Sequence, residues 1–406
     1  MKKSLKKSLC RIGAVMASAT VLLGGGMMMR TPVLPDVSLT AYAATSGDFE
    51  YELLDDGTVT ITKYNGTGGD VKIPAEIDGK SVTMIGNACF WECNDMTTIT
   101  IPESVTIIGE SAFYSCDQLN NVVIPDTVKT LQASAFRDCN GLTSITLGSG
   151  LTEIEHETFY GCQNLPSITI PNNVTKIGGQ AFQGCHNLTS VVLPDSITTI
   201  EGLTFLDCMS LASINIPNSV TTIANRAFNK CQSLKSVVIP GSVTFIDSYA
   251  FSECTGLTSV VVGNNVARIW DYAFSKCTNL TDLTLGTGLE ELAAVPFDQC
   301  ENLKTVTYYG TPESFQKIRM NDTERDLLTP LLQYKEPAET SAVSESTVSE
   351  QEPSTVVDAG SQANSSVSST ASAAERQSSN LGLILGIVIG VLVLVIVILV
   401  LVLVLK

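Results

Sequence analysis

The chain has 406 residues, of which 41 are acidic and 24 are Lys or Arg, so its formal net charge is −17 at pH 7. The sequence has no basic stripe that could meet phosphates, which excludes nucleic acid as an expected partner. A strongly acidic balance suits a soluble exported protein and does not indicate a particular ligand.

The first predicted element is a signal peptide over residues 1–43. Four lysines and Arg11 precede an apolar run that begins at Ile12, which is the order of segments in a secretory signal. The sequence Ala-Tyr-Ala ending at Ala43 offers a cleavage site before Ala44. The apolar run lies further from this site than usual, so retention of the run as a membrane anchor remains an alternative.

Residues 44–81 lie ahead of a periodic region and do not share its period. Apolar residues alternate with polar ones on both sides of Asp56-Gly57, a pattern that predicts a β-hairpin. We expect this segment to form an N-terminal β cap that covers the first unit of the periodic region.

Residues 82–312 repeat every 23 residues without an insertion or a deletion. A phenylalanine column runs from Phe90 to Phe297. A cysteine column keeps the same interval and consists of Cys93, Cys116, Cys139, Cys162, Cys185, Cys208, Cys231, Cys254, Cys277 and Cys300. A fixed period of this length is typical of a solenoid.

The spacing inside one unit predicts its local structure. Leu119, Val122 and Ile124 form a β-branched stretch that ends at Pro125, which predicts a short strand because proline cannot donate to a ladder. Residues 109–116 are enough for only a turn or two of helix. One unit cannot bury its apolar edge alone, whereas stacked units can, at roughly 4.8 Å per turn. We therefore predict an α/β solenoid, a rod of about ten 23-residue repeats with short helical arms.

The unit at residues 174–194 reads Val-Thr-x-Ile-Gly-x-x-Ala-Phe-x-x-Cys-x-x-Leu-x-Ser-Val-x-Leu-Pro. This pattern resembles the BspA-type leucine-rich repeat. The resemblance implies a right-handed leucine-rich-repeat rod with a parallel β-sheet on its concave face. It also implies a cell-surface protein that binds host or microbial partners, and it carries no catalytic residue. The flanks at 44–81 and 313–334 are similar to the family's terminal caps.

The remaining segments predict how the domain is held at the cell surface. Residues 335–380 are rich in Ser, Thr and Glu with almost no large apolar residue, so we expect a disordered tether. Residues 381–405 are uncharged and apolar, long enough for one transmembrane helix. The prediction is a single-pass protein of the cell membrane with its repeats outside and its C-terminus in the cytoplasm.

The cysteine column is the first candidate for chemistry. Each turn brings one sulfur, whereas a zinc site needs several ligands that converge on one point. Disulfides between neighbouring turns would need Cβ atoms closer than parallel stacking allows. We favour cysteine as a small buried apolar residue, with the metal and disulfide interpretations as alternatives.

The histidines give no stronger indication of catalysis. Cys185 and His186 are adjacent and could be taken as a nucleophile and its base, but Cys185 lies in an apolar column and adjacent side chains need not face each other. His156 has no partner set at a catalytic spacing. We predict no catalytic residue, no metal ligand and no cofactor.

Partner binding is predicted on outer surfaces. The strand columns between the buried residues contain mainly Ser, Thr and Val, which suits either close strand packing or an extended binding surface. The arms carry exposed aromatic candidates for partner binding, of which the last three could form one patch: Trp91, Tyr114, Tyr160, Tyr249, Trp270 and Tyr272. Half-buried packing of arm on arm is the alternative for these rings.

The predicted function is non-catalytic recognition or adhesion by a membrane-anchored surface protein. Its partner would be an extracellular protein or glycan of a host or a neighbouring microbe. A passive structural protein of the envelope is one alternative. An enzyme or inhibitor activity carried by the caps is another.

Overall fold

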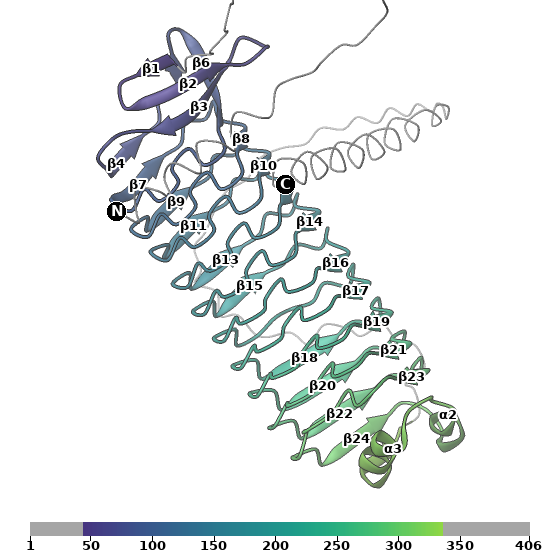
Figure 1. Cartoon of the computed structure of the whole chain (residues 1–406). Coiled ribbons are helices and arrows are strands. Elements are labelled where there is room, and N and C mark those ends of the chain that lie inside the picture. The colour runs from purple at the N-terminus through teal and green to yellow at the C-terminus, as the bar shows by residue number, and fades with distance from the viewer. Residues whose placement is uncertain (1–43, 336–406) are drawn as a thin grey trace, which may run out of the picture. The chain divides into compact units, whose positions relative to one another are not determined.

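The computed structural model describes residues 44–335, which form one stacked unit (Figure 1). The predicted signal peptide, nearly all of the predicted tether and the apolar segment 381–405 lie outside the described residues. Within residues 44–335, no helix is long and apolar enough to cross a membrane.

One wall of the stack is the parallel sheet predicted from the repeat, and we call it the long-strand face. Its strands pair at a shift of one repeat, as Ser144 with Asn121 and Ser259 with Ser236. It consists of β4 (Gly69–Lys72), β7 (Met96–Thr100), β9 (Asn121–Val123), β11 (Ser144–Thr146), β13 (Ser167–Thr169), β15 (Ser190–Val192), β18 (Ser236–Ile239), β20 (Ser259–Val262), β22 (Asp282–Leu285), β24 (Thr305–Tyr308) and β25 (Leu332–Tyr334).

The long-strand face differs from the prediction in two ways. Strands β4 and β25 come from the segments predicted as caps and pair in parallel with β7 and β24, so the stack extends beyond the ten predicted repeats. The face is also interrupted. Strands β11 and β13 are not paired, and residues 213–215, between β15 and β18, form no strand.

A second wall of parallel strands, the short-strand face, was not predicted. It is interrupted once, between the strands at residues 176–177 and 199–200. Two-residue strands at Thr130–Leu131 and Glu153–Ile154 pair in register, and each buries its second residue. Strands this short leave no period-2 pattern in the sequence. The face consists of β6 (Lys80–Ile85), β8 (Ile107–Ile108), β10 (Thr130–Leu131), β12 (Glu153–Ile154), β14 (Lys176–Ile177), β16 (Thr199–Ile200), β17 (Thr222–Ile223), β19 (Phe245–Ile246), β21 (Arg268–Ile269) and β23 (Glu291–Leu292).

The arm that joins the two faces is not helical, so the predicted helical arms are wrong. The Phe113 N–H donates to the Ala135 carbonyl of the next turn at 2.8 Å, whereas the Tyr114 N–H donates to Ser111, three positions back, at 3.1 Å. Ser111 and Ser115 have φ of 54° and 52°, outside the helical region. A helix would direct every N–H along its own segment.

The same alternation repeats along the stack, from Ala88 to Lys276. Every second N–H of the arm bonds to the following turn, and the others close tight turns. We call this column of bonds between turns the arm ladder. It satisfies backbone groups that would otherwise be buried without partners.

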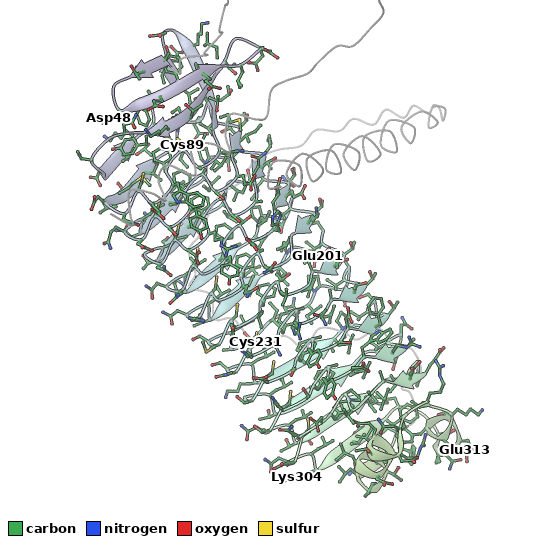
Figure 2. All side chains as sticks on the ribbon, viewed as in Figure 1. Asp48, Cys89, Glu201, Cys231, Lys304 and Glu313 are labelled. Atoms are coloured by element: carbon green, nitrogen blue, oxygen red, sulfur yellow. The ribbon has the colours of Figure 1, made fainter. Side chains whose placement is uncertain are left out.

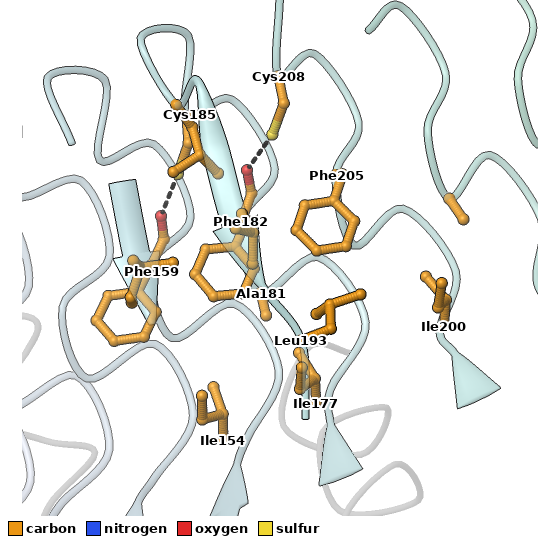
Figure 3. Packing of buried hydrophobic residues seen from close by; sticks show 14 of the residues in the cluster. Ile154, Phe159, Ile177, Ala181, Phe182, Cys185, Leu193, Ile200, Phe205 and Cys208 are labelled. Carbon is orange, nitrogen blue, oxygen red and sulfur yellow. Dashed lines mark hydrogen bonds between the residues drawn. The ribbon is translucent and has the colours of Figure 1, made fainter. Parts of the chain in front are cut away.

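The interior holds the predicted apolar columns (Figure 2). The phenylalanine rings from Phe90 to Phe297 stack with centroids 4.9–5.8 Å apart and planes within 12° of parallel. The Cys208 thiol donates to the Phe182 carbonyl at 3.2 Å, as Figure 3 shows. From Cys116 to Cys300, the cysteine column is therefore buried and hydrogen-bonded, as well as small.

Both ends of the stack are covered. At the N-terminal end, β1 (Ala44–Ser46), β2 (Phe49–Leu53) and β3 (Val59–Tyr64) form an antiparallel arrangement that contains the predicted hairpin, and β5 (Glu76–Ile77) pairs with β6. At the other end lie α2 (Pro312–Gln316), α3 (Asp322–Leu328) and the 3₁₀ turn η2 (Thr329–Leu331). The Tyr64 ring continues the phenylalanine column 5.3 Å from Phe90.

Replacing Leu188 with Ala should lower the free energy of unfolding by about 2–5 kcal/mol, because the side chain is fully buried and the neighbouring turns cannot collapse into the cavity. Urea unfolding of the full-length chain measures the change. Ser190→Ala, at an exposed position two residues further on, is the matched control. A loss smaller than that of the control would contradict the predicted core column.

Candidate functional site

The outer columns of the long-strand face are largely uncharged, as predicted. One column carries valines that are unusually exposed for apolar side chains: Val123 at 56%, Val192 at 59%, Val238 at 62% and Val261 at 38%. Val238 and Val261 lie on adjacent turns, whereas Thr146 and Thr169 separate Val123 from Val192 and Asn215 separates Val192 from Val238. The exposed apolar surface is therefore spread along a column that is otherwise polar and uncharged.

The six aromatic side chains predicted for partner binding separate into three groups. Trp91 and Tyr114 stack at 4.2 Å between ring centroids, and Tyr249 and Tyr272 stack at 5.1 Å. Among the described residues, Trp270 makes no ring contact with either tyrosine of the second pair. The predicted patch of Tyr249, Trp270 and Tyr272 is therefore a tyrosine pair with a separate tryptophan.

Arginine side chains lie against these aromatic groups and were not among the predicted partner-binding residues. The Arg137 guanidinium lies between two rings, 5.8 Å from the Tyr114 centroid and 4.2 Å from that of Tyr160. Arg137 occupies the same column of the repeat as Tyr114 and Tyr160, so the column itself would have revealed it.

The other two groups each have an arginine of their own. Arg226 lies 4.8 Å from the Tyr249 centroid, in that ring's column, and Arg268 lies 4.6 Å from the Trp270 centroid. Each contact is at the distance of a cation–π interaction.

This stacking determines what the aromatic side chains offer a partner. In the two stacked pairs, the rings cover each other's facing surfaces. Trp91 is the most exposed of the six at 41%, and the other five are half-buried. The alternative of arm-on-arm packing therefore describes both pairs, and all six side chains keep part of their surface exposed.

The environment of the cysteine thiols does not suit a nucleophile. The Cys185 thiol is buried and donates to the Phe159 carbonyl at 3.2 Å (Figure 3). Burial raises the pKa of the Cys185 thiol well above its usual value, whereas a reactive cysteine needs a lowered pKa. The hypothesis that Cys185 and His186 form a catalytic pair therefore finds no support in the geometry.

The metal and disulfide interpretations of the column find no geometric support either. The eleven cysteines between residues 44 and 335 are free thiols. In the same range, no group of three or more His, Cys, Asp or Glu side chains is placed to hold a metal ion.

The C-terminal cap contains a buried carboxyl group. In the turns before it, the phenylalanine N–H of the arm donates to the next turn, as from Phe274 to Pro296 at 2.8 Å. Phe297 has no following turn, and its N–H donates to Glu324 Oε1 at 3.4 Å. Glu324 is 1% exposed, and its Oε2 has no hydrogen-bond partner among the described residues. Burial raises the pKa of Glu324 to about 7, against the effect of the Phe297 N–H.

Comparison with known proteins identifies the repeat. The family model described as "BspA type Leucine rich repeat region (6 copies)" matches residues 83–212 and 202–321, more than half of the chain. The chain belongs to the BspA-type leucine-rich-repeat family. No curated protein matches this BspA-type chain.

Several solved structures are similar to this BspA-type chain. A leucine-rich cell surface protein from Faecalibacterium prausnitzii is 24% identical, with a TM-score of 0.37, over 69% of this chain and 98% of its own. A leucine-rich repeat protein from Bacteroides ovatus is 26% identical, with a TM-score of 0.40, over 73% and 100%. The pneumococcal vaccine antigen PcpA is 17% identical, with a TM-score of 0.41, over 72% and 97%. These scores are too low to carry an argument, so the family membership rests on the repeat sequence.

The buried thiols should resist alkylation in the folded chain. Iodoacetamide at pH 8 should leave Cys185 and Cys208 unmodified until urea is added, because both are buried and the thiolate is scarce. Cys93, which is half-buried with its pKa raised to about 12, should react slowly. Mass spectrometry of the labelled peptides distinguishes these cases. Rapid labelling of Cys185 without denaturant would show that its column is accessible.

The C-terminal cap should lose stability as the pH rises. The folded-state pKa of Glu324, about 7, lies above its ordinary value of 4.5, so its contribution is fully present below pH 4.5 and is lost as the pH passes 7. At about 1.4 kcal/mol per pKa unit, the change amounts to ~3 kcal/mol. Amide exchange of α3 at pH 5 and pH 8 measures it.

Glu324→Gln keeps the carbonyl acceptor and removes the titration, so it should flatten this pH dependence. Glu313→Gln, at an exposed carboxyl group of α2, is the control. An unchanged pH profile in Glu324→Gln would assign the effect to another group.

Proposed function

We propose that this chain is a membrane-anchored cell-surface protein whose repeat domain recognises or adheres to an extracellular protein or glycan of a host or a neighbouring microbe. Membership of the BspA-type family supports the recognition role. The apolar segment 381–405, preceded by a long polar stretch, supports the anchor. The role requires no catalytic residue, no metal and no cofactor.

The observation that carries the proposal is the uncharged outer column of the long-strand face, in which exposed valines are interspersed with Thr and Asn. The face repeats the same uncharged pattern from turn to turn, so weak contacts to an extended partner can add along its length. Val192 and Val238 are more than half exposed, and burying them against a partner is favourable at about 25 cal/mol per Å² of apolar surface.

The arm supports a second contact surface within the same function. Tyr114 and Tyr160 lie on either side of Arg137, and Trp91 stacks on Tyr114, so the four side chains occupy successive turns. Aromatic and arginine side chains are the residue types that most often dominate binding energy at interfaces. We include Tyr249, Trp270 and Tyr272 with Arg226 and Arg268 on the same argument.

Surface display of the full-length chain on a non-adherent bacterium tests the function. Adhesion to immobilised matrix proteins, mucins and co-resident bacteria should exceed that of the undecorated host. Val192→Lys together with Val238→Lys should reduce adhesion about tenfold or more, because two charges would be desolvated at the contact. Thr130→Lys together with Thr222→Lys places the same charges on the short-strand face and should leave adhesion unchanged.

Other outcomes separate the alternatives. Wild-type adhesion no greater than that of the host would favour a passive envelope protein. Equal loss in both lysine pairs would exclude the long-strand face as the contact. Trp270→Ala with Tyr272→Ala then tests the arm. Turnover of common hydrolase substrates by the displayed chain would favour an activity carried by the caps.

A further inference from the structure

A column of hydrogen bonds between turns runs along the start of the strands of the long-strand face. We call it the link column. Its members are one repeat apart, and each N–H donates to the carbonyl of the preceding turn: Asn120 to Thr97 at 3.1 Å, Thr143 to Asn120 at 2.9 Å and Thr189 to Pro166 at 2.8 Å. Pro166 belongs to this column but has no N–H. The bond that would reach the Thr143 carbonyl is therefore missing.

The sheet is interrupted beside this missing bond. The second interruption, between β15 and residues 213–215, retains its link bond from the Ala212 N–H to the Thr189 carbonyl at 3.1 Å. Strand β11 pairs with β9 and β13 pairs with β15, but β11 and β13 do not pair with each other. The Ile124 N–H donates to Thr146 at 2.9 Å and the Ile170 N–H donates to Val192 at 3.1 Å. The Leu147 N–H, at the equivalent position between them, makes no such bond within residues 44–335. The Leu147 side chain is half-buried, whereas those of Ile124 and Ile170 are each 1% exposed.

An open cavity of about 600 Å³ lies at this break. Its lining includes hydroxyl groups of both unpaired strands, from Ser144, Thr146, Ser167 and Thr169, together with Leu147. A volume of this size is within the range of small-molecule sites. We call this cavity the Pro166 groove.

The far rim of the Pro166 groove is polar and held by its own hydrogen bonds. Asp126 Oδ1 accepts from the Ser149 N–H at 2.6 Å, and Asn173 Nδ2 donates to the Ser149 carbonyl at 2.8 Å. Asp126 is the one charged residue in the lining, and its hydrogen bonds to Ser149 lower its pKa. The groove therefore holds a negative charge and no positive one, which disfavours an anionic ligand.

We infer that the Pro166 groove binds a neutral oligosaccharide. Sugar hydroxyls both donate and accept, so they can pair with the strand hydroxyls, the Thr143 carbonyl and the Leu147 N–H, and the apolar Leu147 side chain can meet the C–H groups of a sugar ring. A peptide strand does not fit between β11 and β13, because these strands still have Cα atoms within 8 Å of each other. The inference rests on the proposed recognition function and gives it a ligand class.

Restoring the missing link is the most direct perturbation. Threonine already occupies the link column at positions 143 and 189, where its hydroxyl also donates to the preceding turn: Thr143 Oγ1 to the Asn120 carbonyl at 3.0 Å and Thr189 Oγ1 to the Pro166 carbonyl at 2.9 Å. Pro166→Thr should therefore supply the missing bond to the Thr143 carbonyl and make that carbonyl unavailable to a ligand. Slow hydrogen exchange of the amide introduced at position 166 would report the new bond.

Calorimetric titration of the purified full-length chain tests the ligand. The probes are linear neutral gluco-, manno- and xylo-oligosaccharides, in a detergent without a sugar head group. At least one neutral series should bind saturably, and Pro166→Thr should weaken that binding about tenfold or more, the effect of losing one or two hydrogen bonds. Ala212→Thr introduces the same residue in the link column where the N–H link is already present, and it should leave binding unchanged.

A second variant keeps the test informative if Pro166→Thr does not fold. Thr146→Ala with Thr169→Ala removes two hydroxyl groups from exposed positions and should also weaken binding about tenfold. The inference fails if no neutral oligosaccharide binds, if both groove variants bind as the wild type does, or if only sulfated sugars or peptides bind. Displayed cells that still adhere under those outcomes would leave the proposed recognition function standing.

Discussion

Hydrogen bonds between backbone groups of successive turns, one repeat apart in the chain, hold this structure together. They run through both sheet faces and through the arm, and the arm ladder continues where the faces are interrupted. Each turn of the arm gives every second N–H to its neighbour and keeps the others for its own tight turns. Because the bonds demand the same backbone path in successive turns, one residue inserted in a single unit would displace every column that follows.

The interior follows from that fixed register. Identical side chains are brought to the same place on successive turns, so one well-packed arrangement is repeated along the stack. The phenylalanine rings stack on each other, and each cysteine thiol from Cys116 to Cys300 gives the preceding turn's phenylalanine carbonyl a second hydrogen bond. Cysteine suits this position because it is nearly as small as alanine, is buried readily and carries a weak donor.

Function in such a stack depends on outer columns and on departures from the repeat. The outer valines and the aromatic and arginine columns repeat over some turns and not others, so they give the rod distinct surfaces. Pro166 is a departure of another kind, because it removes one donor from a column of bonds, and a cavity lies beside this position. Glu324 supplies a missing hydrogen-bond partner at the end of the stack. Its carboxyl oxygen accepts from the Phe297 N–H, where a following turn would offer a backbone carbonyl.

The sequence by itself determined the periodic stacking, the buried columns, the strands of the long-strand face and the N-terminal hairpin, because side-chain periodicity reports directly which positions are buried. Only the tertiary structure decided that the arm is a ladder and not a helix, that a second set of paired strands exists and that a groove lies beside Pro166. In each case a backbone group can pair either with a local partner or with one a full repeat away. The local sequence does not indicate which partner is used, because the distant one comes within reach only when the turns are stacked.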